Sequence, residues 1–471
     1  MELVSRFTMI DLIGILCIIA CVLFILALKG LSSASTAKTG NLFGMIGMAI
    51  AISVPVTRSS DICWLPIMLI GCGGLIGYYV AMKIKMMDLP QLVAAFHSLV
   101  GLAAVFIAVS AYLAPHLHRI HMTSTFIPLS NAIELAIGAA IGAITFTGSI
   151  VAFGKLQGFI KRPLIFKFQH KLNLLIGFGL LISILCFVTN QTPIFLAMII
   201  FGALLLGYLL VMPIGGADMP VIVSMLNSYS GWTAAGIGFT LSNNVLIIVG
   251  ALVGASGAIL SSIMCRGMNR SLFNVIVGGV GNSQDQAPAS NSVSGGNVKV
   301  CSPEDAAFII KNAGSVIFVP GYGMAVAQAQ HAIKELSEIL KKDEILIRYA
   351  IHPVAGRMPG HMNVLLAEAN IPYDDVLEID EINHEFPGTD VVIVIGANDI
   401  TNPAAKNDPT SPIYGMPVLD VEKAKTVLFV KRSLAAGYAG IDNPLFYQDN
   451  TMMILGDAKK VCEEILIAIK S

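Results

Sequence analysis

Residues 315–326, SVIFVPGYGMAV, decide how the C-terminal part of the chain folds. An apolar run leads directly into Gly321 and Gly323, which is typical of a buried strand that turns sharply into a helix. Glycines at these positions permit a tight turn and a close backbone approach to a pyrophosphate, and the first amides of a helix favour negative charge. Val326 replaces the third glycine of the full fingerprint. The placement between strand and helix at the start of a domain still favours nucleotide binding.

The residues around this stretch alternate short apolar runs with amphipathic stretches, which is the pattern of a parallel sheet covered by helices. Strands are predicted at Ser315–Val319, Ile345–Ile351, Asp375–Ile379, Val391–Ile395, Thr426–Val430 and Met452–Leu455. Helices are predicted at Ala325–Leu340, Asn363–Glu368 and Ala458–Ile469. Six strands in this rhythm predict an α/β Rossmann-like domain with a doubly wound parallel sheet, whose ligands bind beyond the carboxyl ends of the strands.

Polar residues follow three of these strands where a dinucleotide would need them. Arg357, in HPVAGRMPGH after the second strand, suits bidentate pairing with phosphate oxygens. GANDITNP after the fourth strand supplies Asn398 and Asp399. KRSLAAGYAG after the fifth begins with Lys431–Ser433, an anion site suited to the 2′-phosphate that distinguishes NADP from NAD. Each loop alone is compatible with an ordinary exposed turn, but four loops at one sheet edge favour a nucleotide site.

The N-terminal half has the composition of a membrane protein. Of all residues 55% are hydrophobic and 13% charged, and residues 1–280 hold 14 Lys and Arg against 6 acids, whereas residues 281–471 hold 15 against 24. Because a bilayer core requires about 20 apolar residues per helix, we predict about nine spans, with eight or ten as alternatives. They are Leu12–Leu28, Leu42–Val56, Cys63–Met82, Leu92–Leu113, Leu129–Phe153, Leu174–Thr189, Ile194–Ile214, Met219–Leu241 and Val245–Met264.

The positive charges predict the orientation of these spans. With nine crossings and a cytoplasmic C-terminal end, three basic residues lie outside: Arg6, Arg58 and Arg119. Eleven lie inside: Lys29, Lys38, Lys83, Lys85, Lys155, Lys161, Arg162, Lys167, Lys171, Arg266 and Arg270. We therefore expect the N-terminus outside and everything after residue 265 in the cytoplasm.

Polar residues within the spans are the ones that favour a function, because such side chains at membrane depth are costly unless they face a partner or water. His97, in the fourth span, has an ordinary pKa near 6.5 that suits proton loading. A neutral histidine bonded to a neighbouring helix is the structural alternative. One face of the eighth span carries four small or polar residues: Ser224, Asn227, Ser228 and Gly231.

Other titratable residues of this half favour a bland interpretation. Glu134 and Asp218 lie near the predicted interfaces, where snorkelling or solvation accounts for them. His116, His118 and His121 share one outer loop, but without a fourth ligand a solvated loop is favoured over a metal site. The eight cysteines show no paired spacing, so we expect neither disulfides nor a metal.

The segment 282–298, NSQDQAPASNSVSGGNV, is rich in Ser, Asn, Gly and Gln and is predicted to be a flexible tether. It divides the chain into a transmembrane domain, 1–281, a linker, 282–298, and a soluble domain, 299–471. Nothing in the chain indicates a nucleic-acid partner.

Six long motifs make the chain resemble the beta subunit of bacterial proton-translocating NAD(P) transhydrogenase over nearly its whole length. They are FHSLVGLAAV (Phe96–Val105), GADMPVIVSMLNSYSGW (Gly216–Trp232), VPGYGMAVAQAQH (Val319–His331), IHPVAGRMPGHMNVLLAEA (Ile351–Ala369), GANDITNPAA (Gly396–Ala405) and KRSLAAGYAGIDNPLF (Lys431–Phe446).

The resemblance implies an NADP(H) site and a proton path. By motif, the NADP(H) site is lined by Gly321, Tyr322, Gly323, Val354, Ala355, Gly356, Arg357, Met358, Pro359, Gly396, Ala397, Asn398, Asp399, Gly415, Met416, Lys431, Arg432, Ser433, Gly437, Tyr438, Asp457 and Ala458. Asp399 is also a candidate for the chemistry, and His97 and Asn227 match positions of the proton path.

The function implied is hydride exchange between NADP(H) on this chain and NAD(H) on a partner alpha subunit, coupled to proton passage across the bacterial inner membrane. The resemblance also implies a dimer of alpha-beta units in the lipid bilayer. Two alternatives of other classes are a transporter or channel whose cytoplasmic domain senses NADP(H), and a membrane-anchored dehydrogenase. The first predicts charged or broken midplane helices, whereas these spans offer mainly His97 and Asn227.

Overall fold

The computed structural model describes residues 2–31, 36–58, 64–85, 88–118, 120, 126–160, 168–215, 218–269, 271–272, 275, 298–358, 360–411, 413–437 and 439–470. The chain forms two compact units, one made of 1–157, 167–211 and 225–258 and the other of 158–166, 212–224 and 259–471. The linker predicted at 282–298 lies outside the described residues, apart from Val298.

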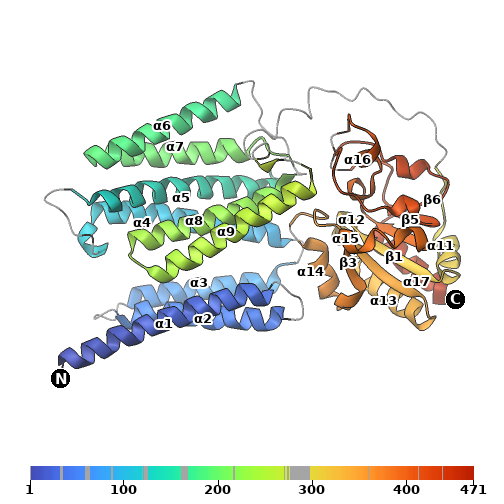
Figure 1. Ribbon diagram of the computed structural model, residues 1–471, viewed down its shortest axis with the longest axis horizontal. Helices are drawn as coiled ribbons and strands as arrows, with labels where there is room; N and C mark the ends of the chain where they lie inside the picture. The colour runs from blue at the N-terminus through green and yellow to red at the C-terminus, as the bar shows by residue number, and fades with distance from the viewer. Residues whose placement is uncertain are drawn as a thin grey trace. The chain divides into compact units, whose positions relative to one another are not determined.

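Nine long helices form the described part of the N-terminal half (Figure 1). They are α1 (Glu2–Leu31), α2 (Ala37–Arg58), α3 (Trp64–Lys83), α4 (Leu89–Leu113), α5 (Leu129–Leu156), α6 (Gln169–Asn190), α7 (Pro193–Val211), α8 (Met219–Thr240) and α9 (Asn244–Gly267), with a short 3-10 turn η2 (Pro115–His118). Eight of the described helices are long and apolar enough to cross a membrane, and α8 is too polar to be counted with them. The predicted polytopic helical domain is thus confirmed, with eight clear spans.

Small residues let these helices approach closely. The backbones of α4 and α5 meet at Gly101 and Gly142, where an added Cβ on Gly101 would lie 2.5 Å from the Gly142 carbonyl oxygen. Helices α8 and α9 meet at Gly231 and Gly254 in the same way, and the Ser228 hydroxyl donates to the Gly254 carbonyl at 2.6 Å. Part of the polar face predicted on the eighth span therefore serves helix packing.

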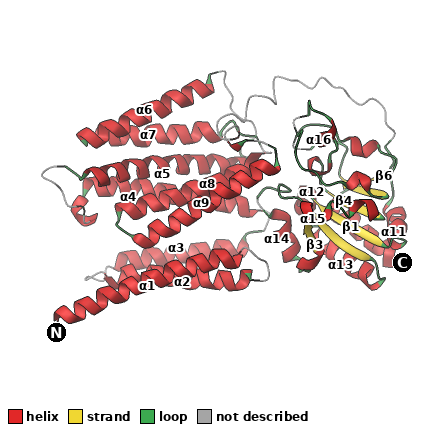
Figure 2. Cartoon of the chain, in the orientation of Figure 1, coloured by secondary structure: helices red, strands yellow, loops and turns green. Residues whose placement is uncertain are grey.

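The C-terminal part contains a six-stranded, all-parallel sheet with the order β3-β2-β1-β4-β5-β6, which confirms the predicted doubly wound architecture. The strands are β1 (Ser315–Pro320), β2 (Leu346–Ile351), β3 (Val376–Glu378), β4 (Val391–Ile395), β5 (Thr426–Lys431) and β6 (Thr451–Leu455). Figure 2 shows the strands in yellow among red helices. Strands β1 to β3 are added towards one edge of the sheet and β4 to β6 towards the other, so the switch point lies between β1 and β4. These two strands pair from Val316 with Val391 to Pro320 with Ile395.

Helices and short turns precede, connect and follow the strands. They are α11 (Pro303–Lys311), α12 (Tyr322–Ala327), α13 (Gln330–Lys342), α14 (His361–Glu368), η4 (Tyr373–Asp375), α15 (Ile379–Ile382), η5 (Phe386–Gly388), η6 (Asp399–Thr401), α16 (Ala404–Asn407), η7 (Val421–Lys423), η8 (Pro444–Tyr447) and α17 (Ala458–Lys470). The single helix predicted at Ala325–Leu340 is wrong, because Gln328 adopts a left-handed conformation (φ 54°) that separates α12 from α13. Helix α11 was not predicted, although Ser302 caps it by accepting from the Asp305 amide.

Buried aromatic pairs contribute to the core of the C-terminal domain. Phe318 on β1 stacks on Tyr349 of β2 with ring centroids 5.3 Å apart, and Phe429 on β5 meets Phe446 edge-on at 4.9 Å. All four rings are at most 3% exposed. This core holds the strands in register, so the loops that follow them are carried on a rigid base.

Three glycines bring the loops after β1 and β4 into backbone contact. The Gly323 amide donates to the Gly396 carbonyl at 2.8 Å, and the Gly321 amide donates to the Ile395 carbonyl at 2.9 Å. A Cβ on Gly321 would lie 2.5 Å from the backbone of Ala397, and one on Gly396, whose φ is +64°, would lie 2.3 Å from the Cα of Gly323. No side chain fits between these two loops.

Replacement of Gly396 by alanine is therefore expected to destabilise the soluble domain by about 1–3 kcal/mol, because the new Cβ overpacks the contact and the left-handed backbone is strained. Thermal unfolding of the purified chain measures this as a fall in the melting temperature of that domain. Gly388→Ala is the matched control, since nothing lies within 4 Å of its Cβ position. Equal shifts for the two variants would contradict the packing argument.

Candidate functional site

The loops that follow β1, β2, β4, β5 and β6 meet at one edge of the sheet. All six strands are parallel, so their carboxyl ends share this edge. The sequence-predicted nucleotide residues lie in or beside these loops, except Gly415 and Met416, which belong to the longer connection between β4 and β5. Pro359 and Tyr438 lie outside the described residues.

The glycines of the β1 loop have a packing role. Helix α12 is only six residues long, and the amide of Gly323 in its first turn is already bonded to the Gly396 carbonyl. Contact with the β4 loop accounts for both Gly321 and Gly323. Their predicted contact with a pyrophosphate stays a prediction.

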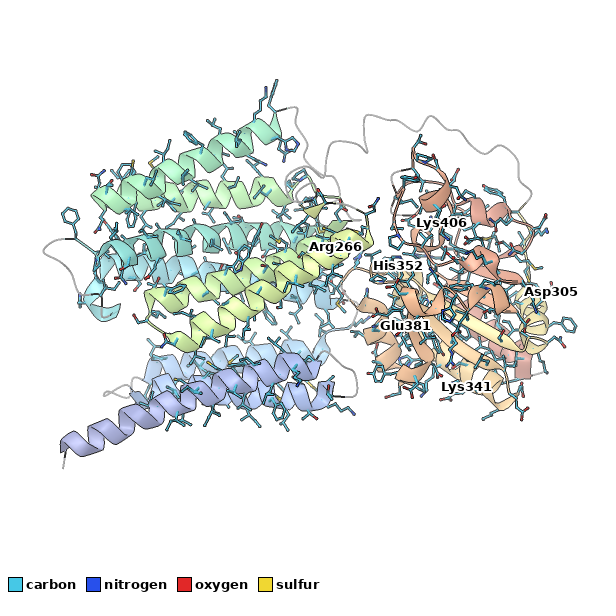
Figure 3. The ribbon with its side chains drawn as sticks, in the orientation of Figure 1. Arg266, Asp305, Lys341, His352, Glu381 and Lys406 are labelled. Carbon is cyan, nitrogen blue, oxygen red and sulfur yellow. The ribbon has the colours of Figure 1, made fainter. Side chains whose placement is uncertain are left out.

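Two buried, uncharged histidines shape the β2 loop, and sequence reasoning did not single them out. The His352 side chain (Figure 3) has Nε2 2.8 Å from the Pro417 carbonyl, while its Nδ1 accepts from the Val354 amide at 3.3 Å. His361 Nδ1 accepts from the Arg357 amide at 3.0 Å. Burial lowers the pKa of both imidazoles to about 4. Because each Nδ1 accepts a hydrogen bond, the proton of each neutral ring resides on Nε2.

His361 also restricts the backbone beside it. Gly356 has a φ of +111°, and a Cβ there would lie 2.5 Å from His361 Nδ1. The motif HPVAGRMPGH contains both histidines, so the signal was present in the sequence, but only the fold shows that they are internal.

Tyr322 and Arg357 come together from different loops. The Arg357 guanidinium lies 4.7 Å from the centroid of the Tyr322 ring, which is a cation-π contact. The Tyr322 and His361 rings are 6.5 Å apart. The β1 and β2 loops thus form one surface in which a half-buried aromatic ring is flanked by a cation and an imidazole.

Asn398 and Asp399 fasten the β4 loop to the β5 loop. The Asp399 carboxylate accepts from the Ala439 amide at 3.0 Å and from the Asn398 side-chain amide at 3.3 Å. A Cβ on Gly437 would lie 2.5 Å from Asp399 Oδ1, so the β5 loop passes directly over this carboxylate.

The cationic residues after β5 differ in their exposure. Lys431 is half-buried, donates to the Ala435 carbonyl and lies 4.8 Å from the Phe446 ring centroid. Burial lowers the pKa of its ammonium, while Asp399 and Asp442 oppose that shift. Arg432 and Ser433 are exposed. They are the groups of this loop that can reach an anion in solvent.

The other residues predicted for the nucleotide site contribute backbone and apolar contacts to these loops. Met416 packs with Ala405, Ile413 and Val418, and half-buried Val354, Ala439 and Ile441 lie against this cluster. The Gly415 amide donates to the Ala405 carbonyl at 2.8 Å. Buried Ala355 and Ala397 lie in the β2 and β4 loops, and the Met358 carbonyl accepts from the His361 amide at 3.2 Å.

Asp457 caps the last helix. Its carboxylate accepts from the amides of Lys459 and Lys460 at 3.1 and 3.4 Å, directly before Ala458 begins α17. The carboxylate therefore has a local structural role beside the β6 end.

In the helical half, His97 and Asn227 lie on α4 and α8, and both helices pack on α5. His97 is half-buried, and among the described residues its buried Nε2 has no hydrogen-bond partner. Within the described part of the chain, no hydrogen bond joins the two side chains. The predicted pair is thus carried by two helices with a common neighbour.

The residues of the helical half that were predicted to be solvated differ in their surroundings. Glu134 accepts from Asn131 on the same helix at 3.5 Å, whereas Asp218 is only 3% exposed and is not a snorkelling or solvated side chain. Of the three histidines predicted to share an outer loop, His116 is exposed and His121 lies outside the described residues. No group of metal-ligating side chains occurs in the part of the chain that the structure describes.

Comparison with known proteins covers almost the whole chain. The family model described as NAD(P) transhydrogenase beta subunit matches residues 13–468. The NAD(P) transhydrogenase subunit beta of Rhodospirillum rubrum is 59% identical over 434 residues, which cover 91% of this chain and 93% of that relative. The subunit beta of a named strain of the same bacterium gives the same values.

The buried histidines predict how the stability of the soluble domain depends on pH. Their pKa is about 4 in the folded chain against 6.5 ordinarily, so the unfolded chain binds more protons between these values. The free energy of unfolding should be constant above about pH 6.5. It should fall by up to about 1.4 kcal/mol per pH unit for each histidine as the pH drops towards 4.

Denaturant unfolding at a series of pH values checks this slope. His352→Asn should remove the contribution of one histidine to the slope of unfolding free energy against pH. His331→Asn, at an exposed position on α13, should leave that slope unchanged. A slope that is the same in all three proteins would refute the assignment.

Proposed function

Because the chain belongs to the NAD(P) transhydrogenase beta subunit family, we propose that it holds NADP(H) and exchanges a hydride with NAD(H) bound by a partner alpha subunit, coupled to proton passage across the membrane. One observation carries the proposal. A doubly wound sheet whose β5 loop begins with the exposed cation Arg432 is in the same chain as eight described helices able to span a bilayer.

The NADP(H) would lie at the carboxyl edge of the sheet. Arg432 and Ser433 are exposed there and would contact the 2′-phosphate, while Lys431 shapes the loop from within. The Tyr322 and Arg357 pair offers an aromatic face and a cation to the rest of the dinucleotide. Asp399 lies under the β5 loop, where it fixes the backbone close to the nucleotide.

The hydride transfer requires a partner. Two nicotinamide rings must approach within reacting distance, so the alpha subunit would dock its NAD(H) against this edge. The assembly is expected to be a dimer of alpha-beta units in the bacterial inner membrane. If α8 also crosses the bilayer, as a ninth span, the bias of eleven inner to three outer basic residues supports an outer N-terminus and a cytoplasmic nucleotide domain.

Proton passage would act by shifting the nucleotide domain between occluded and open states. A shift from 1:99 to 99:1 takes about 5.5 kcal/mol, and one elementary charge crossing ~100 mV supplies about 2.3 kcal/mol. One proton per hydride therefore shifts the equilibrium partially unless a pH gradient adds to the potential. His97, whose Nε2 has no hydrogen-bond partner within the described part of the chain, is the titratable group proposed for this step.

The alternative of a transporter or channel with an NADP(H)-sensing domain is less well supported. Every described spanning helix carries few charges, and the family to which the chain belongs is named for an enzyme subunit. A cheap discriminator is a neighbouring gene for a chain with an NAD-type Rossmann domain.

Arg432→Ala is expected to weaken NADPH binding about 10- to 100-fold, because a charge-assisted hydrogen bond to the 2′-phosphate is lost. Equilibrium binding to the purified full chain measures this, with NADH as the comparison nucleotide. Lys425→Ala is the control, since Lys425 precedes the opposite end of β5 and pairs with Asp390. A wild-type chain that does not prefer NADPH to NADH would overturn the proposed function.

His97→Gln is expected to abolish or uncouple proton movement, because glutamine cannot titrate. Vesicles reconstituted with both subunits allow nucleotide reduction and lumen pH to be followed together. The affinity for NADPH should persist, and His116→Gln, at an exposed position in η2, should pump normally. Normal pumping by the His97 variant would remove this residue from the proton path.

A further inference from the structure

Two fully buried asparagines lie beneath the loop after β5, and the proposed function uses neither. Asn402 ends the β4 loop and Asn443 ends the β5 loop, and both are 0% exposed. A buried amide is costly unless both its donor and its acceptor are satisfied, so their partners show what these side chains do.

The two asparagines cross between the loops reciprocally. Asn402 Nδ2 donates to the Asp442 carbonyl of the β5 loop at 3.0 Å, and Asn443 Nδ2 donates to the Asn398 carbonyl of the β4 loop at 3.2 Å. Each Oδ1 remains local, accepting from the Ala404 amide at 2.9 Å in one case and from the Leu445 amide at 3.0 Å in the other. Each of the two asparagines therefore accepts a hydrogen bond from its own loop through the side-chain oxygen and donates one to the opposite loop through the side-chain nitrogen.

A third cross-link completes the attachment. The Asp399 carboxylate accepts from the Ala439 amide at 3.0 Å. The β5 loop is thus fastened to the β4 loop near its middle, through Asp399, and at its end, through the asparagines. Its beginning, at Arg432 and Ser433, is exposed.

We propose that Asn402 and Asn443 are positioning residues that clasp the β5 loop and thereby slow the escape of NADP(H). The inference rests on the proposed function, because it assumes that this loop covers the phosphorylated nucleotide. A loop held at its end cannot swing away from the ligand without breaking two buried hydrogen bonds. Loss of either bond makes opening easier and shortens the residence time of the nucleotide.

Serine is the substitution that separates the two roles of each asparagine, which are the local acceptor role of Oδ1 and the cross-loop donor role of Nδ2. Its hydroxyl can still accept from a backbone amide two residues on, but it is too short to reach the opposite loop. It also adds no charge beside Lys431, whose surroundings include Asp399 and Asp442. Asn402→Ser and Asn443→Ser therefore remove the clasp with little other change.

Asn450 provides the matched control. Its Nδ2 also bridges two segments, donating to the carbonyls of Glu422 and Ala424 at 3.1 and 2.9 Å, but it lies before β6, at the amino edge of the sheet. Asn450→Ser loses equivalent hydrogen bonds far along the strands from the nucleotide edge.

The test uses the full chain assembled with its alpha subunit, and NADPH as the probe. Asn443→Ser and Asn402→Ser should each raise the dissociation rate of NADPH about tenfold, equivalent to about 1.4 kcal/mol. They should raise KM for NADPH and leave KM for NADH, which the partner binds, unchanged. Asn450→Ser should alter neither dissociation rate nor KM.

The dissociation rates of NADPH decide between the clasp and a merely structural role of the asparagines. A rise in NADPH dissociation confined to the two clasp variants supports the proposal. An unchanged rate, or the same rate change in Asn450→Ser, overturns it, because the hydrogen bonds then contribute only general stability. If one clasp variant does not fold, the other still tests the proposal, because each removes its own cross-loop donor. A wild-type assembly that does not retain NADPH at all would instead refute the proposed function.

Discussion

The contact between the β1 and β4 loops, made without any side chain, is the constraint on which the rest of the nucleotide edge depends. Gly321, Gly323 and Gly396 press backbone on backbone where the sheet changes direction. This contact fixes the position of the β1 loop relative to the sheet, and so it places Tyr322 beside Arg357 of the β2 loop. On its other side, the same β4 loop supplies the carbonyl and carboxylate that hold the β5 loop. One tight junction thereby orients loops from four strands.

Uncharged polar groups and one carboxylate, that of Asp399, hold this edge together, and the exposed cation Arg432 lies at its rim. His352, His361, Asn402 and Asn443 are nearly or fully buried, and backbone groups satisfy their polar atoms except His361 Nε2, which has no hydrogen-bond partner among the described residues. Neutral donors and acceptors can be buried at modest cost when they are paired, whereas a buried charge requires a partner charge. A site built in this way leaves an exposed cation such as Arg432 available to a polyanionic ligand. It also makes the stability of the loops depend on the histidines remaining neutral.

The helical half follows the opposite rule, because packing there relies on the absence of side chains. Glycine pairs such as Gly101 with Gly142 and Gly231 with Gly254 bring helix backbones together, and hydroxyls such as that of Ser228 are used up by a neighbouring carbonyl. His97 is the titratable member of a small group there, with Ser149, Gln169 and Asn173, whose buried polar atoms have no hydrogen-bond partner among the described residues. Polar groups at membrane depth that are not consumed by packing are the ones best suited to carry protons.

The sequence by itself determined the class of each half, the six strands to within a residue or two, and the family, because burial and periodicity are local patterns and the motifs are long. It also indicated that Arg357, Asp399 and Lys431 belong to one edge, because parallel strands end together. Only the tertiary structure decided that the fingerprint glycines pack against Gly396, that Gln328 divides the first helix, and that Asn402 and Asn443 cross between loops. The glycine and asparagine contacts join residues distant along the chain, which no local pattern encodes, whereas the break at Gln328 is a local backbone conformation that the apolar periodicity does not reveal.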